Sequence, residues 1–228
     1  MEKKNLRMER ERHRQEENKH SILQAAERVF VQKGYSLSTV DDIAEEAQFS
    51  KATLYRYFKS KSDIFLEIIY GSFESSYQEI KKIQEKSLSA EEKLRELIGY
   101  IFFYYHEKKN LARILFMEKA AMEKITKTKL DFQIPHPPIH PELPPRFLSK
   151  MRQISDLISE IIKEGVESGE FRQMDIHDAS VVLGSLIRGF HFRGPLRDED
   201  YSIQEATDLL HSFFLNGIKS QIKVRKGD

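Results

Sequence analysis

The 228-residue chain contains no cysteine. A disulfide framework, a cysteine-ligated zinc or iron–sulfur site and a thiol nucleophile are therefore all excluded. The chain also has almost no net charge, because 37 Lys and Arg residues face 36 Asp and Glu residues. A protein that coats polyanions along its whole surface is not expected, and any contact with nucleic acid must come from a local patch.

Long apolar runs are missing as well. No stretch approaches the roughly 18 consecutive apolar residues of a membrane span, and the charged start of the chain lacks the apolar core of a signal peptide. We therefore expect a cytoplasmic protein with no membrane partner. Alternation at period two is also absent, whereas nearly every segment after residue 20 repeats apolar residues at helical spacing. The pattern predicts an all-α protein of about nine helices.

Signals for helix ends support this prediction. Gly34 suits the end of the first helix, and six prolines within residues 133–145 predict a loop between two later helices. Serine or threonine N-caps mark the starts of five predicted helices, at Thr39, Ser50, Ser60, Ser89 and Ser202.

The most informative segment is residues 47–62, which contain no acidic residue and four basic ones: Lys51, Arg56, Lys59 and Lys61. Leu54 and Phe58 give this segment an inner helical face, so its cations, hydroxyls and tyrosines are expected on the surface. Such a helix, directly after the short amphipathic segment 39–47, can enter the major groove of DNA. The sequence therefore predicts a helix-turn-helix.

This segment resembles the amino-terminal domain of TetR family regulators. The resemblance covers about residues 19–75 and is carried by the run from Thr53 to Phe58 (Thr-Leu-Tyr-Arg-Tyr-Phe), followed by Lys-Ser-Lys61. It implies a helix-turn-helix domain at residues 17–77, after a charged arm at 1–16 and before an effector-binding and dimerisation domain at 78–228. The turn departs from the pattern, because Gln48 stands where a glycine is common, and its strain is expected to cost about 1 kcal/mol.

The resemblance also implies roles for individual residues of the helix-turn-helix. Four side chains would lie nearest the base edges: Lys51, Ala52, Thr53 and Tyr57. Three would hold phosphates at the two ends of the motif: Thr39, Tyr55 and Lys61.

Two further groups of residues are candidates in the second domain. By resemblance this domain encloses an effector cavity, which aromatic residues, methionine and isolated polar groups suit. The candidates are Phe102, Tyr105, His106, Phe116, Met122, Arg188 and His191; ordinary packing in the core is the alternative for them. The last two predicted helices are too apolar to face water, and by resemblance they pair with their copies in a dimer. The candidates for this interface are Leu183, Leu186, Phe190, Leu210, Phe213 and Phe214; packing within one chain is the alternative for them.

The prediction is a ligand-responsive transcriptional regulator that represses from a palindromic operator as a homodimer. A largely apolar small molecule would release it from double-stranded DNA, and neither a cofactor, a metal site nor an enzymatic activity is expected. Two alternatives stay open: a helical carrier or enzyme that uses the second-domain cavity, and an architectural protein that binds DNA without sequence preference.

The charged start of the chain allows two interpretations. Its seven basic residues could enter a minor groove. Its five acidic residues weaken the positive field, however, and favour a disordered segment or a helical extension of the first helix.

Overall fold

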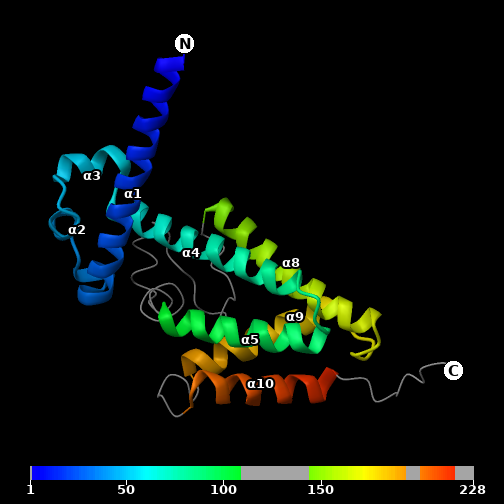
Figure 1. Cartoon of the computed structure of the whole chain (residues 1–228). Coiled ribbons are helices and arrows are strands. Elements are labelled where there is room, and N and C mark those ends of the chain that lie inside the picture. The colour runs from blue at the N-terminus through cyan, green and yellow to red at the C-terminus, as the bar shows by residue number, and fades with distance from the viewer. Residues whose placement is uncertain (1, 109–143, 194–200, 219–228) are drawn as a thin grey trace. The chain divides into compact units, whose positions relative to one another are not determined.

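The computed structural model describes residues 2–108, 144–193 and 201–218. The regular elements in these ranges are helices (Figure 1), which confirms the predicted all-α class. Their bounds are α1 (Glu2–Leu37), α2 (Val40–Glu46), α3 (Lys51–Tyr57), α4 (Lys61–Gln84), α5 (Ala90–Glu107), α8 (Pro145–Glu167), α9 (Ile176–Arg193) and α10 (Ile203–Ile218). The helix predicted near residues 111–127 and most of the proline-rich segment lie outside the described residues.

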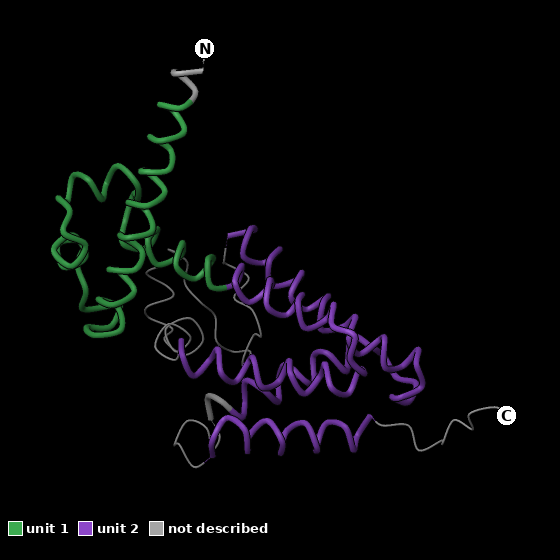
Figure 2. The backbone as a smooth tube through the Cα atoms, in the orientation of Figure 1, with its two compact units in different colours: residues 1–72, 110–134 green, residues 73–109, 135–228 purple. Residues whose placement is uncertain are grey.

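The described residues form two compact units, one up to Ser72 and the other from Phe73 onward (Figure 2). The division falls within α4, so this helix gives its first half to unit 1 and its second half to unit 2. The domain boundary predicted at residue 77 lies on the same helix.

Unit 1 is built on buried apolar faces of α1 to α4. Three aromatic side chains form its centre, since the ring of Tyr35 lies 5.5 Å from that of Phe30 and 5.1 Å from that of Phe65, between centroids. Gly34, with φ of 74°, interrupts the regular helix where the sequence predicted its end. The other large side chains that are almost fully buried here are Ile22, Ile43, Leu54 and Ile64.

Unit 2 packs α5, α8, α9 and α10 around one apolar core. Glycine is required at position 165, because a Cβ there would lie 2.2 Å from the ring of Phe171. An ion pair lies at the edge of this core: the buried ammonium of Lys93 donates to both carboxylate oxygens of Glu164, which is 42% exposed, at 2.8 Å. The large side chains of the core with no exposed surface are Phe102, Leu94, Leu97, Ile98, Ile161, Ile162 and Leu183.

Candidate DNA-binding site

The helix-turn-helix begins at a capping box on α2. The Thr39 hydroxyl accepts from the backbone N–H of Asp42 at 3.1 Å, and the Asp42 carboxylate accepts from the backbone N–H of Thr39 at 2.8 Å. Hydrogen bonds from Lys33 and Thr39 lower the pKa of Asp42 to about 2. These contacts keep Thr39 exposed at the start of α2, where the sequence analysis placed a phosphate contact.

The turn between α2 and α3 has the strain predicted from the sequence. Gln48 has φ of 57°, a left-handed conformation that non-glycine residues seldom adopt. The turn persists because the backbone satisfies its donors: the N–H of Gln48 bonds to the carbonyl of Glu45 at 3.0 Å, and the N–H of Phe49 bonds to that of Ala44 at 3.0 Å. This turn directs the chain into α3.

Helix α3 is held by buried side chains on its inner face and is capped at its start. Leu54 and the C-cap residue Phe58 are buried, and the Ser50 hydroxyl accepts from the backbone N–H of Thr53 at 3.1 Å. With these two side chains pointing inward, the remaining residues of α3 face outward. Lys51, Ala52, Tyr55 and Arg56 are exposed, while Thr53 and Tyr57 are half-buried.

Neighbouring groups orient three of the predicted DNA contacts. The ammonium of Lys51 lies 2.9 Å from a carboxylate oxygen of Asp41 on α2, and this hydrogen bond raises the pKa of Lys51. The Thr53 hydroxyl lies 2.8 Å from that of Ser50. Tyr57 is tied to α1, because its hydroxyl accepts from the Asn18 side-chain amide at 3.2 Å.

Lys61 takes a position that its predicted role did not include. Its ammonium donates to the backbone carbonyls of Tyr35 and Ser38, both at 2.6 Å, and lies 4.4 Å from the centre of the Tyr35 ring. These contacts join the start of α4 to the segment between α1 and α2. Lys61 therefore holds the helix-turn-helix together from within, and its phosphate contact stays a prediction.

Two residues at this site, Arg56 and Asn18, were not among the predicted DNA contacts. Arg56 is exposed in the last turn of α3, and its place in the acid-free window was the signal that could have found it. Asn18 has no such signal, since only the packing of α1 against α3 brings its amide to Tyr57.

The effector candidates are partly described. Phe102 is buried, with its ring 5.8 Å from that of Phe190. Burial raises the pKa of Tyr105 to about 12, and the nearby positive charge of Arg188 opposes part of that rise. His106 is exposed. Phe116, Met122 and the side chain of His191 lie outside the described residues.

The six dimer candidates divide into a buried and an exposed group. Leu183, Leu210 and Phe214 are buried within unit 2, and Phe190 is half-buried. Leu186 and Phe213, in contrast, are 43% and 73% exposed. Two valines on α9, Val181 and Val182, are exposed in the same way and extend the apolar surface.

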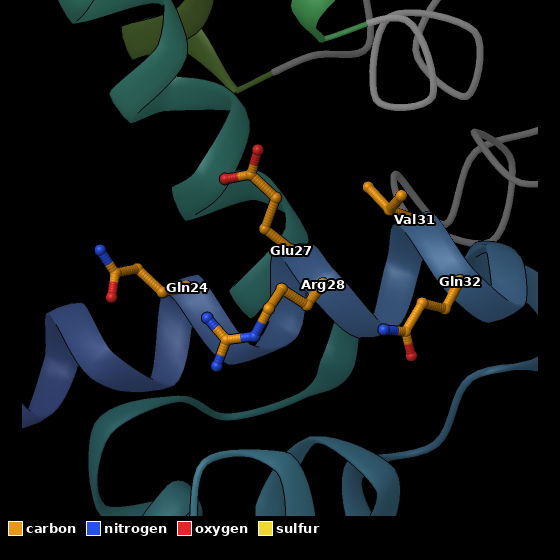
Figure 3. Close-up of a pocket in the computed structure, with 5 residues that line it drawn as sticks. All are labelled: Gln24, Glu27, Arg28, Val31 and Gln32. Atoms are coloured by element: carbon orange, nitrogen blue, oxygen red, sulfur yellow. The ribbon is translucent and has the colours of Figure 1, made fainter.

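A pocket of about 400 Å³ lies on unit 1, along α1 (Figure 3). Polar and charged side chains dominate its lining, and one of them, Arg28, is engaged by Glu46 at 2.6 Å. None of the predicted effector residues is part of it. The lining residues are Gln24, Glu27, Arg28, Val31 and Gln32.

Among the described residues, no group of three or more His, Asp or Glu side chains is placed to hold a metal ion. The helices within the described ranges include none with the length and apolar character needed to cross a membrane.

Comparisons with known proteins agree with this geometry. Residues 22–68 match the family described as bacterial regulatory proteins, tetR family. HTH-type transcriptional regulator QacR of Staphylococcus aureus is 27% identical over 209 residues, which are 88% of this chain and 97% of QacR. The fatty acid metabolism regulator protein of Bacillus subtilis is 22% identical over 201 residues, covering 88% of this chain and 95% of that protein.

The fold is shared with a solved structure of the transcriptional regulator FadR from Bacillus subtilis in complex with stearoyl-CoA. The TM-score is 0.68 at 22% identity, over 87% of this chain and 98% of that one. The matched family region holds α2 and α3 together with the parts of α1 and α4 that support them. The chain thus carries a DNA-binding domain of the tetR family at residues 22–68 and is similar over most of its length to DNA-binding transcriptional regulators.

Proposed function

We propose that two copies of this chain bind a palindromic operator, repress transcription there, and leave the DNA when a largely apolar ligand with an anionic head binds unit 2. The observation that carries the proposal is the outer face of α3. This face is exposed and holds no acidic residue, and the buried side chains of Leu54 and Phe58 on the opposite face hold the helix in place. No catalytic step is assigned to the chain, and this role places it in the cytoplasm.

Ala52, Thr53 and Tyr57 are assigned to base edges, with Thr39 and Tyr55 holding backbone phosphates on either side. A methyl group and a hydroxyl can distinguish base pairs in the major groove, where each pair presents its own pattern of donors, acceptors and methyl groups. The capped, buried attachment of α3 supports this role, because it limits the loss of conformational freedom on binding.

Lys51 must leave an ion pair before it can bind DNA. Its ammonium is held by Asp41 in the free protein, so it must exchange this carboxylate for a base edge or a phosphate on DNA. The pair is exposed, and exposed pairs contribute only about 0–1 kcal/mol. The exchange therefore costs little.

Dimerisation is assigned to the exposed apolar side chains of α9 and α10. Val182 and Leu186 are four residues apart and share one face of α9, while Leu183 and Ile187 face the core. Phe213 of α10 is 73% exposed, an unusual state for so large an apolar ring. A second copy that covers these faces would join two chains and so give the assembly two α3 helices, one for each half-site of an operator whose half-sites are about 34–36 Å apart.

The effector is assigned to the class of long apolar chains with an anionic head. Aromatic rings of α5 and α9 approach each other at Phe102 and Phe190, and the guanidinium of Arg188 lies close enough to affect the titration of Tyr105. Arg188 donates to the Ser185 hydroxyl at 3.4 Å, and no described carboxylate pairs with it. The stearoyl-CoA complex of FadR supports this class.

The first test is selection from a random duplex library with the full chain at physiological salt. The expected result is an enriched inverted repeat, and Thr53→Ala is expected to change the preferred base at one position per half-site. Equal binding of random and selected duplexes would overturn sequence-specific regulation. A monomer in sedimentation experiments at working concentration would overturn the dimer.

The second test titrates stearoyl-CoA into the complex of the protein with the selected duplex. Release is expected for the wild type, with an increase of about tenfold in the required ligand concentration for Arg188→Gln, equivalent to about 1.4 kcal/mol. Arg152→Gln, an exposed position on α8, is the matched control. Operator affinity that does not change with ligand at fixed salt would overturn the effector assignment.

A further inference from the structure

Helix α1 begins well before the part that packs against the helix-turn-helix. Residues 6–17, here called the amino-terminal extension, are all exposed, although they continue α1 as regular helix (Figure 2). An exposed helix gains little from burial, so packing alone gives no reason for this segment. The charge pattern of the segment, in contrast, suggests a role for it.

Three of the four arginines of the extension share one side of the helix. Arg7, Arg10 and Arg14 are three and four residues apart, so they line one side of the helix, here called the basic stripe. Glu9 and Glu16 are seven residues apart and lie on the opposite side. Arg12 shares the side of these two glutamates, and Glu11 and Glu17 lie beside the stripe, so the stripe side carries a small excess of positive charge while the segment as a whole is nearly neutral.

Contacts further along α1 show which way the basic stripe points. Arg14 precedes Asn18 by one helical turn, and Asn18 donates to Tyr57 on α3. Arg10 precedes Arg28 by 18 residues, or about five full turns, and Arg28 binds Glu46 at the end of α2. The stripe therefore lies on the side of α1 that faces α2 and α3.

The end of α3 is within electrostatic reach of the extension. The pKa of Glu11 is lowered chiefly by its hydrogen bond with Arg14, and the charge of Arg56 in the last turn of α3 adds to this. Two acidic residues flank the stripe and are engaged by neighbours: Glu11 by Arg14 at 2.9 Å, and Glu17 by His13 at 3.2 Å. Such exposed pairs are weak enough for a phosphate to replace them.

We propose that Arg7, Arg10 and Arg14 bind backbone phosphates of DNA next to the half-site read by α3. The inference rests on the proposed function and extends the contact of each protomer beyond the helix-turn-helix. Seven residues of helix span about 10 Å, which matches about three base pairs of duplex. Guanidinium groups suit this task, because their planar fork matches phosphate oxygens.

The chemistry favours DNA over the other anionic partners. A helix that lies on a membrane needs an apolar face, but the exposed apolar residues Leu6 and Met8 point to different sides and Glu9 and Glu16 occupy the side opposite the stripe. An acidic protein surface would fit the charge, yet it would give no reason for the stripe to lie on the side of the recognition helix.

The test measures the binding of Arg7→Gln/Arg10→Gln/Arg14→Gln to two kinds of duplex over a range of salt concentrations. One is the inverted repeat selected by the wild type, made with short flanks and with flanks longer by about one helical turn. The other is a long duplex of random sequence. Glutamine keeps the helix propensity close to that of arginine, and circular dichroism checks that the variant is folded.

Longer flanks are expected to strengthen binding by the wild type and to leave the triple variant unchanged. The slope of log K against log salt is expected to fall by about 5 on the long-flank operator, for six lost phosphate contacts in a dimer. Two matched single variants compare the two sides of the helix: Arg10→Gln, on the stripe, should weaken binding, and Arg12→Gln should not. Arg12 carries the same charge two residues away, on the other side.

Each outcome separates this inference from the proposed function. If the triple variant keeps the wild-type salt slope and flank dependence on the selected repeat, the stripe does not bind DNA, while the regulator assignment stands. If no repeat is selected, the random duplex still tests the stripe, because phosphate contacts are independent of sequence. Equal losses for Arg10→Gln and Arg12→Gln would also overturn the inference, since they would indicate a general charge effect. Unchanged DNA binding together with loss of binding to anionic vesicles would indicate a membrane contact instead.

Discussion

Replacing Lys61 by methionine removes an ammonium group that two backbone carbonyls and an aromatic ring surround, while it keeps most of the apolar stem. The carbonyls are those of Tyr35 and Ser38, each 2.6 Å from the nitrogen, and the ring of Tyr35 lies 4.4 Å away. The segment that they belong to precedes α2, so its position decides where the helix-turn-helix begins. The substitution therefore tests a tertiary role against the phosphate contact predicted from the sequence.

The magnitude follows from the contacts. A hydrogen bond from a charged donor contributes about 1.5–3 kcal/mol, and we take about 1 kcal/mol for each because the side chain is only half-buried. The contact with the ring adds about 0.5–1 kcal/mol. The sum predicts that Lys61→Met lowers the free energy of unfolding by about 2–3 kcal/mol, and Tm by about 5–10 °C.

The assay is chemical denaturation followed by circular dichroism, with salt-dependent operator binding measured in parallel. Lys59→Met is the matched control, because Lys59 is an exposed cation two residues away and its loss should change stability by less than about 0.5 kcal/mol. Wild-type stability in Lys61→Met, together with a salt slope smaller by about 0.9 per protomer, would refute the tertiary role and support the phosphate contact.

Three further predictions follow from single contacts. Gln48→Gly should raise the free energy of unfolding by about 0.5–1 kcal/mol, since glycine relieves the strain at φ of 57° but costs more chain entropy; a urea titration that finds a loss would contradict this. The pKa of Asp42 is lowered to about 2 in the folded chain, so its stabilising contribution is present above pH 4 and is lost as pH falls towards 2. Asp42→Asn should flatten the dependence of stability on pH in that window, and an unchanged pH profile would contradict the assignment. Glu164→Ala should lower the free energy of unfolding by about 1–2 kcal/mol, because the buried ammonium of Lys93 loses its partly exposed carboxylate partner, whereas Lys93→Met should cost less; a larger cost for Lys93→Met in chemical denaturation would contradict this.

The sequence predicted the local structure well. Helix starts follow from side chains that bond to nearby backbone groups, so Thr39, Ser50 and Ser89 could be identified as caps without knowledge of the fold. The strained turn at Gln48 was predictable from the family resemblance, because glutamine stands at a position where related sequences commonly carry glycine. The exposed, acid-free face of α3 followed from helical periodicity once Leu54 and Phe58 were assigned to the inside.

Contacts between residues distant in the sequence were decided only by the tertiary structure. Nothing near Lys61 in the sequence shows that carbonyls 23 and 26 residues earlier would take its ammonium. The same holds for Asn18 on Tyr57, and for the division of the dimer candidates into buried Leu183 and exposed Phe213. Helical periodicity specifies which residues share a face, but packing decides which neighbour, or solvent, that face meets. For this reason the sequence by itself determined the helices and the type of DNA-binding motif, whereas the fold decided which cations stay free to meet a phosphate.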